Sequence, residues 1–421
     1  MGKEILKKKD FCWKIILFWG ILICSIVFFN TPGTGDMSIW MDWIEYADQY
    51  GVKEGYRLQR DMYPPFALII QIILKKIYPM LSSFVALRVV NIFFLLISTL
   101  LIQILYRREK ITLIFFGALV LSTNLGYLDI EMVPFFVLAF HFISKDKYVL
   151  SGIFYTLLCL VKFQPLIILP YIVLYFVDIF DVNENRFQLK LKWKKMMGMA
   201  IPPIIIGGVV CIFYKGAPIK ALMKALFKSG SVISPNGLNF GWVVQFILEK
   251  FYPDLFGTLD NGKITIIWDV APIYQCFKYI FVILYLCAVI LLFLHRKKTI
   301  KLVLQCSLIG YTAYFLFNSG VHENHLFLGM ILMILLYLHE PIQTNYFRML
   351  LYIIIFNFNL LILYGMSGWG MGFDRAINSA FDPTLLIAVF NVISLTITII
   401  QIICEVNKGN ILTIKRRDIN E

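Results

Sequence analysis

Apolar segments of membrane-spanning length follow one another along almost the whole chain, and this pattern constrains the fold more than any other feature. A transmembrane helix needs about 20 mainly apolar residues, with a range of roughly 17–25. Almost no soluble stretch separates the segments, and only 15% of the residues are charged. The sequence therefore predicts an all-α polytopic membrane protein with a single membrane domain over residues 1–421. The predicted spans, about twelve in number, are 13–30, 84–106, 111–128, 130–144, 148–163, 165–180, 196–214, 271–295, 300–317, 324–339, 347–366 and 382–404.

The basic residues predict the orientation of these spans. The net charge is +13, but the basic clusters separate the spans and form no single surface, which argues against nucleic acid as a partner and is typical of the positive-inside rule. With the Lys-rich N-terminus in the cytoplasm, alternation also places there the basic residues at 107–110, 145–147, 190–195, 295–298, 348 and 415–417. Both termini are then cytoplasmic. The outer loops are 31–83, 215–270 and 367–381.

The N-terminal segment and the composition indicate where the protein resides. The apolar run 11–29 follows a basic flank, but no small-residue cleavage pattern comes after it, so we expect a retained signal anchor. The many Lys, Ile and Asn residues are typical of an AT-rich bacterial genome, which favours a bacterial plasma membrane. The eight cysteines occur singly, which supports neither a disulfide framework nor a zinc site.

Two outer segments predict helices that lie at the membrane surface. Residues 64–79 are apolar but short and end in Lys75-Lys76, which favours an interfacial helix in the first outer loop. Residues 218–228 place lysines four apart with apolar residues opposite, which is an amphipathic helical pattern. We expect this second helix to lie on the outer headgroups and contact membrane lipids.

Ionisable residues at the outer span ends are functional candidates, because such residues are costly at membrane depth. Asp36 stands near the start of a predicted helix, where its carboxylate can accept a proton from a hydroxyl or simply cap the helix. His322 and His325 are candidate cations, and the alternative is that both bond to neighbouring carbonyl groups. Lys162 lies at the end of a span. The alternative is that its side chain simply extends to the lipid headgroups.

Five short segments, taken in order, resemble the GT-C superfamily of glycosyltransferases, polytopic enzymes that use polyprenyl-phosphate sugars and include bacterial mannosyltransferase-like members. The first is the loop Gly35–Trp43, followed by Tyr63-Pro64-Pro65. The others are Gly126–Asp129, Val161–Pro165, Ser234–Trp242 and Val321–His325. This chain departs from the family pattern at Tyr127, which replaces Gln, at Asn324, which replaces a basic residue, and at Trp242, which comes one place late.

The resemblance implies a GT-C type bundle of about twelve transmembrane helices, with juxtamembrane helices in the first outer loop, and a set of site residues. Asp36 corresponds to the family's general base. Donors near the leaving phosphate stabilise its developing charge, and the residues expected to do so are His322, Glu323, His325 and Lys162. The residues expected to bind substrate are Asp129, Gln164, Asn239 and Trp242.

The expected reaction is an inverting transfer of a hexose from a polyprenyl-phosphate donor to a lipid-linked or cell-envelope glycan, on the extracytoplasmic face. Two alternatives remain open: a flippase or transporter of lipid-linked saccharides, and a polysaccharide polymerase. Asp129 and Glu131 are possible ligands of magnesium or manganese, but two acids at a helix start are also favoured by the helix dipole. We therefore expect no metal site and no cofactor. The assignment requires that Asp36 and His322 share one cavity.

Overall fold

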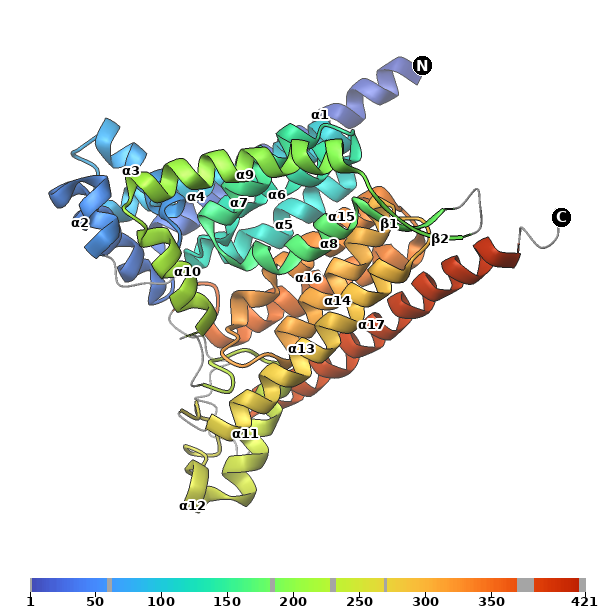
Figure 1. Cartoon of the computed structure of the whole chain (residues 1–421). Helices are drawn as coiled ribbons and strands as arrows, with labels where there is room; N and C mark the ends of the chain where they lie inside the picture. The colour runs from blue at the N-terminus through green and yellow to red at the C-terminus, as the bar shows by residue number, and fades with distance from the viewer. Residues whose placement is uncertain are drawn as a thin grey trace. The chain divides into compact units, whose positions relative to one another are not determined.

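The computed structural model describes residues 2–58, 63–181, 186–227, 232–268, 271–368 and 382–415. These residues form mainly α-helices (Figure 1). Six of the described helices are long and apolar enough to cross a membrane: Ser83–Tyr106, Trp193–Phe213, Gln275–Leu294, Ile300–Phe317, Gln343–Tyr364 and Pro383–Lys408. Shorter apolar helices lie at Lys14–Asn30, Tyr148–Val161, Gln164–Leu174 and Glu323–His339. The predicted all-α polytopic membrane fold is confirmed.

The chain divides into two compact units. Unit 1 comprises Met1–Phe163, Ala200–Phe227 and Leu360–Met371, and unit 2 comprises Gln164–Met199, Lys228–Asn359 and Gly372–Glu421. The prediction of one membrane domain over the whole chain stays a prediction.

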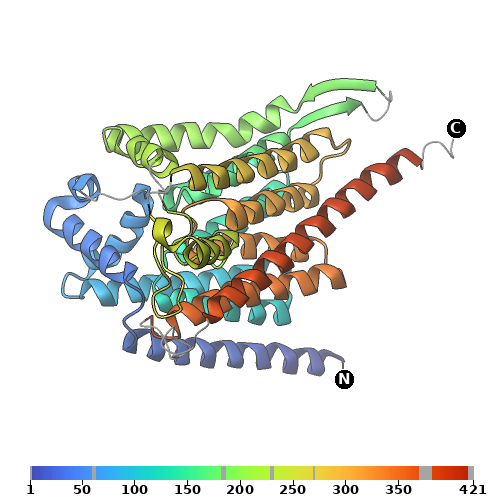
Figure 2. The same ribbon diagram turned by 90° about the horizontal axis from the view of Figure 1, so that it is seen from below.

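Unit 1 is built around helix α4. Its helices are α1 (Gly2–Asn30), α2 (Asp36–Leu58), α3 (Pro65–Ile77), α4 (Ser83–Tyr106), α5 (Glu109–Leu125), α6 (Asp129–Ser144), α7 (Tyr148–Val161), α10 (Ala217–Phe227) and most of α9 (Trp193–Phe213). Helix α4 contacts α1, α2, α3, α5 and α6. Its buried face includes Leu87, Phe94 and Leu95, which recur at helical spacing. Figure 2 shows α1, in dark blue, running along this group of helices.

The connection between α1 and α4 contains two helices, as predicted for the first loop. Helix α2 begins at Asp36, is amphipathic and changes direction at Gly51, whose φ of 79° suits glycine. Helix α3 has Pro65 at its first position and Lys76 in its last turn. Lys76 Nζ bonds Asp48 Oδ1 at 2.7 Å, and this hydrogen bond lowers the pKa of the Asp48 carboxyl. Helix α10 confirms the helix expected near 218–228, whose last residue lies outside the described ones.

Unit 2 is built around helix α14. Its elements are η1 (Gln164–Ile168), α8 (Leu169–Leu174), β1 (Val177–Asp181), β2 (Arg186–Leu191), α11 (Phe240–Phe251), α12 (Pro253–Phe256), α13 (Ala271–Leu294), α14 (Ile300–Phe317), η2 (Glu323–Leu326), α15 (Phe327–His339), most of α16 (Gln343–Tyr364) and α17 (Pro383–Lys415). Helix α14 contacts α8, α11, α13, α15 and α17, and it is largely buried. It is therefore the core helix of this unit.

The predicted span 165–180 is wrong as a continuous helix. The structure has the short helices η1 and α8 there, followed by the antiparallel hairpin of β1 and β2. Asp178 and Asp181 interrupt the apolar run, and Val177-Asp178-Ile179 alternates apolar with polar residues, which is a strand pattern. Lys192 Nζ lies 3.0 Å from Asp178 Oδ2 and ties the end of the hairpin back to its start.

Candidate functional site

Asp36 stands at a short, tightly held connection in unit 1. Helix α1 ends at Asn30 and α2 begins at Asp36. The backbone N–H of Gly33 donates to the Ser367 carbonyl at 3.1 Å, and that of Thr34 donates to the Leu125 carbonyl at 3.0 Å. The Asp36 side chain is half-buried. Its carboxylate is therefore placed by a fixed backbone at the first turn of an amphipathic helix.

Three aromatic rings pack beside Asp36 on the buried face of α2. Trp40, Trp43 and Tyr63 meet edge to face, with ring centroids 4.5–5.3 Å apart. Trp40 lies one turn after Asp36, so the two share a helix face. Its buried Nε1 has no hydrogen-bond partner among the described residues. The site thus holds a donor as well as an acid.

Tyr56 anchors this aromatic group from the far end of α2. Its hydroxyl donates to the Tyr63 carbonyl at 3.0 Å. Burial, reinforced by Tyr214 and Cys211, raises the pKa of the Tyr56 hydroxyl well above its usual range. The group therefore stays a protonated donor at physiological pH.

Lys162 and Asp129 form a buried ion pair in the same unit. The Nζ to Oδ1 distance is 2.9 Å, and the two side chains are 8% and 1% exposed. The ammonium also lies 5.7 Å from the centroid of the Tyr63 ring and within electrostatic range of Asp36. The fold thus brings together Asp36, Asp129 and Lys162, three residues that the sequence singled out from three separate segments.

Lys162, which the sequence predicts to bind the donor phosphate, has the Asp129 carboxylate as its partner. Its role at the donor phosphate stays a prediction. Glu131, fully buried in α6, has the Gln71 side chain of α3 as its neighbour. Among the described residues no three His, Cys, Asp or Glu side chains are arranged to hold a metal ion. The expectation that no cofactor is needed stays a prediction.

In unit 2 the fold joins two of the motif segments. Asn236 and His322 form an antiparallel backbone bridge. The Gly320 N–H donates to the carbonyls of Val232 and Ile233 at 3.0 and 3.1 Å. The segments Ser234–Trp242 and Val321–His325 therefore form one double loop, although about 80 residues separate them in sequence.

The two histidines lie at the edge of this double loop. His325 Nδ1 is 2.9 Å from the Tyr314 hydroxyl, and its ring stacks on that of Tyr314 with centroids 5.8 Å apart. The His322 side chain is 54% exposed, whereas that of Glu323 is 5% exposed. His322 is therefore the most exposed member of this motif. Asp36 belongs to unit 1 and His322 to unit 2. That the two share a cavity stays a prediction.

Asn239 and Trp242 support the double loop from inside. Asn239 Oδ1 accepts from the Trp242 N–H at the start of α11, and its Nδ2 donates to the Phe315 carbonyl at 2.8 Å. Trp242 is fully buried, and its Nε1 donates to Thr384 Oγ1 at 2.8 Å. We expected both residues to bind substrate, but these contacts favour a supporting role. Gln164, the remaining candidate, is half-buried at the start of η1.

The sequence did not indicate the residues that complete this support. Asp382 Oδ1 accepts from the N–H and the hydroxyl of Thr384, and its Oδ2 accepts from the Ile264 N–H at 3.0 Å. An acidic residue followed by Pro383 is a helix-start signal, and it was available in the sequence. The link from Asp382 through Thr384 to Trp242 cannot be predicted from the sequence, because only the fold brings α17 against α11.

Gly237 provides a test of the double loop. A Cβ atom at this position would lie 2.4 Å from the Val321 carbonyl oxygen, so Gly237→Ala must displace the backbone of one segment. We expect a lower melting temperature in detergent and at least a tenfold lower activity, since a displacement of about 1 Å can cost 10²-fold. Gly207→Ala is the matched control because open space surrounds Gly207. Equal behaviour of the two variants would show that the two segments are not in close contact.

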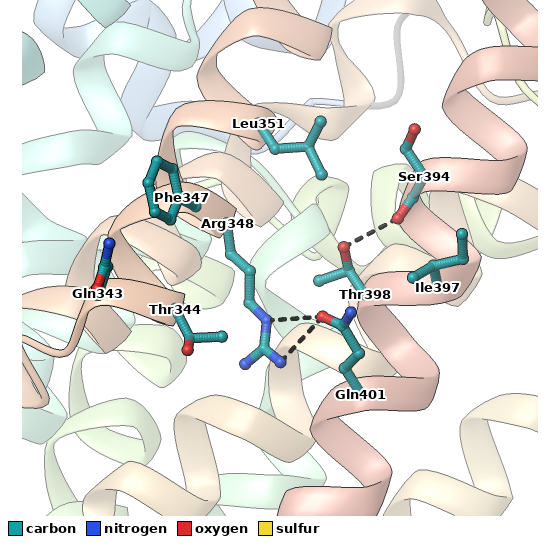
Figure 3. A pocket seen from close by; sticks show the side chains of 9 residues that line it. All are labelled: Gln343, Thr344, Phe347, Arg348, Leu351, Ser394, Ile397, Thr398 and Gln401. Carbon is teal, nitrogen blue, oxygen red and sulfur yellow. Dashed lines mark hydrogen bonds between the residues drawn. The ribbon is translucent and has the colours of Figure 1, made fainter.

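A groove of about 640 Å³ lies between α16 and α17 in unit 2 (Figure 3). The residues that line it are Gln343, Thr344, Phe347, Arg348, Leu351, Ser394, Ile397, Thr398 and Gln401. Arg348 is buried, bonds Gln401 Oε1 at 3.1 Å and pairs with Glu405 at 2.7 Å. The guanidinium therefore ties the two helices together, and its charge is already balanced.

Comparison with known proteins agrees with the resemblance of the motifs. The model of glycosyltransferase family 87 matches residues 62–319. No curated protein matches the chain. The matched segment contains Asp129, Lys162 and the Ser234–Trp242 loop. Asp36 and the His322–His325 segment lie outside it.

Proposed function

Because this chain belongs to glycosyltransferase family 87, a GT-C-type family of membrane glycosyltransferases, we propose that it transfers a hexose from a polyprenyl-phosphate donor. The acceptor is a hydroxyl of a lipid-linked or cell-envelope glycan. The proposal is supported by the half-buried carboxylate of Asp36, held by a fixed backbone beside aromatic rings and a buried ion pair.

The proposed reaction is a single displacement that inverts the anomeric centre. The acceptor oxygen forms a bond to the anomeric carbon while the bond from that carbon to the phosphate oxygen breaks. The acceptor proton passes to Asp36, and the electron pair of the broken bond stays on the lipid phosphate. General base catalysis of this kind contributes typically 10²–10⁴-fold.

Lys162 and Asp129 support the base in this mechanism. The ammonium of Lys162 favours the ionised form of a nearby carboxylate, and Asp36 lies within its electrostatic range. The ion pair with Asp129 holds Lys162 in place. Trp40 Nε1 has no hydrogen-bond partner among the described residues, and it is a donor suited to a sugar hydroxyl.

His322 and His325 bind the leaving phosphate in the proposed mechanism. Donors fixed before the reaction stabilise developing charge without reorganisation. His325 is fixed by its bond to Tyr314, and His322 is the exposed member. Glu323 lies between the two histidines in the sequence. Its buried side chain helps to set the distance between their rings.

A transfer assay with vesicles of defined orientation tests both the donor and the face of the membrane. Right-side-out vesicles are given labelled mannosyl or glucosyl polyprenyl phosphate, and labelled glycan is detected by mass spectrometry. We expect transfer in these vesicles and none in sealed inside-out vesicles. Transfer from a nucleotide sugar in the absence of the lipid donor would overturn the proposed donor class.

A further inference from the structure

Arg88 is a buried cation in a membrane helix, and the proposed reaction does not yet use it. It lies in the second turn of α4 and is fully buried. No carboxylate among the described residues pairs with it. Its guanidinium packs 5.2 Å from the centroid of the Phe84 ring. Because a charge at membrane depth is costly, such a residue is a functional candidate.

The partners of Arg88 are backbone carbonyls from two separate segments. Nη1 donates to the Asn124 carbonyl at 2.6 Å and to the Thr123 carbonyl at 3.4 Å, and Nη2 donates to the Thr31 carbonyl at 2.7 Å. The last carbonyls of a helix have no partner within it, and a cation is favoured there by the helix dipole. One guanidinium thus joins the end of α5 to the chain that follows α1.

Each of these segments leads directly to a carboxylate of the candidate site. Asp36 follows Thr31 by five residues, and Asp129 follows Asn124 by five. By binding both segments, Arg88 helps to set the distance between Asp36, the proposed base, and Asp129, the partner of Lys162.

The connection between Thr31 and Asp36 has little freedom to absorb a change at Arg88. Thr31 Oγ1 donates to Asn124 Oδ1 at 2.7 Å, and Thr34 Oγ1 donates to the Leu125 carbonyl at 3.2 Å. A Cβ atom at Gly33 would lie 3.1 Å from Arg88 Nη2 and 2.9 Å from the Leu125 carbonyl oxygen. A displacement of Thr31 is therefore passed on to Asp36.

We propose that Arg88 is a positioning residue for the transfer reaction: it holds Asp36 at its working distance from the Lys162–Asp129 pair by binding the two segments that precede the carboxylates. The inference rests on the proposed function, in which Asp36 is the base. Arg88 acts through the backbone, and it contacts neither the sugar nor the phosphate.

Lysine and methionine at this position separate the contribution of charge from that of geometry. Lysine keeps the charge but presents one compact ammonium, whereas the arginine fork spans two carbonyl groups. A misplacement of about 1 Å costs roughly 10²-fold in rate. We expect Arg88→Lys to lower kcat about tenfold and Arg88→Met about a hundredfold, with KM for the donor within about twofold of wild type.

The matched control is Arg348→Lys, which alters another buried arginine of a membrane helix. Arg348 binds the side chain of Gln401 (Figure 3) and pairs with Glu405, so its replacement is expected to lower the melting temperature while kcat per folded molecule stays near wild type. The same result for Arg88→Lys would overturn the proposal and leave Arg88 with a structural role. Thr31→Val removes the neighbouring tie to Asn124 and is expected to lower kcat in the same way, should the Arg88 variants fail to fold.

The measurements also distinguish the inference from the function on which it rests. Wild-type protein that transfers no sugar from any polyprenyl-phosphate donor would contradict the function itself. Active wild-type protein with an unchanged kcat in both Arg88 variants would contradict only the positioning role.

Discussion

Asp36→Asn protein is expected to insert and fold normally and to lose about 10²–10⁴-fold of its transfer rate. Asparagine keeps the size of the side chain and an oxygen that caps a helix as well as aspartate does, but it cannot accept the acceptor proton. The substitution therefore separates the two interpretations of Asp36, base and cap. The measurement is initial transfer rate per folded molecule, with the melting temperature in detergent recorded in parallel.

The control for this variant lies in the same helix. Asp42 is exposed on α2, so Asp42→Asn is expected to keep both rate and stability. Asp36→Asn protein that still transfers sugar at close to the wild-type rate would remove Asp36 from the chemistry. A loss of stability without a change in rate per folded molecule would leave it as a helix cap.

The sequence predicts most of the fold because the bilayer imposes a length and a charge rule on every span. Length and hydropathy alone predict the spans 84–106, 300–317 and 382–404, and each coincides with a helix of the structure, the last of which begins at Pro383. The segment 165–180 has the same hydropathy but forms a hairpin at its end. The signal for the strand is the alternation of apolar and polar residues around Asp178. A hydropathy average over about 20 residues does not resolve so short a pattern.

The candidate site was only partly predictable, for a different physical reason. Sequence identifies residues that are costly where they stand, such as Asp36, Asp129 and Lys162, but it does not say which of them neutralise each other. The structure pairs Lys162 with Asp129, and the role of Lys162 at the phosphate stays a prediction. Trp242 is buried and donates to Thr384, a contact that no sequence pattern indicates, and its role at a sugar stays a prediction.

Arg88 shows what a motif search misses. It lies inside the predicted span 84–106, and an arginine there is itself a signal, since charge in a span is rare. Its partners are backbone carbonyls, however, and any residue type supplies a carbonyl. No pattern of side chains in the sequence can therefore identify what Arg88 binds.

Breaking the buried pair of Lys162 and Asp129 is expected to have the largest effect on stability. Lys162→Met leaves the Asp129 carboxylate without a cation at a position where its side chain is 1% exposed. Removal of one partner of a buried ion pair costs about 3–5 kcal/mol of the free energy of unfolding. We expect a markedly lower melting temperature in detergent. Lys76→Met is the control, because its pair with Asp48 is exposed and such pairs contribute about 0–1 kcal/mol.

Combining Lys162→Met with Asp129→Leu separates the structural role of the pair from its chemical role. With both charges removed no uncompensated charge stays buried, so stability is expected to return close to that of wild type. Transfer is expected to stay low, because Asp36 then lacks the cation that favours its ionised form. A double variant as unstable as Lys162→Met would show that the lost ion pair is not the cause. A stable double variant with wild-type transfer would show that the pair holds the fold together and contributes nothing to the base.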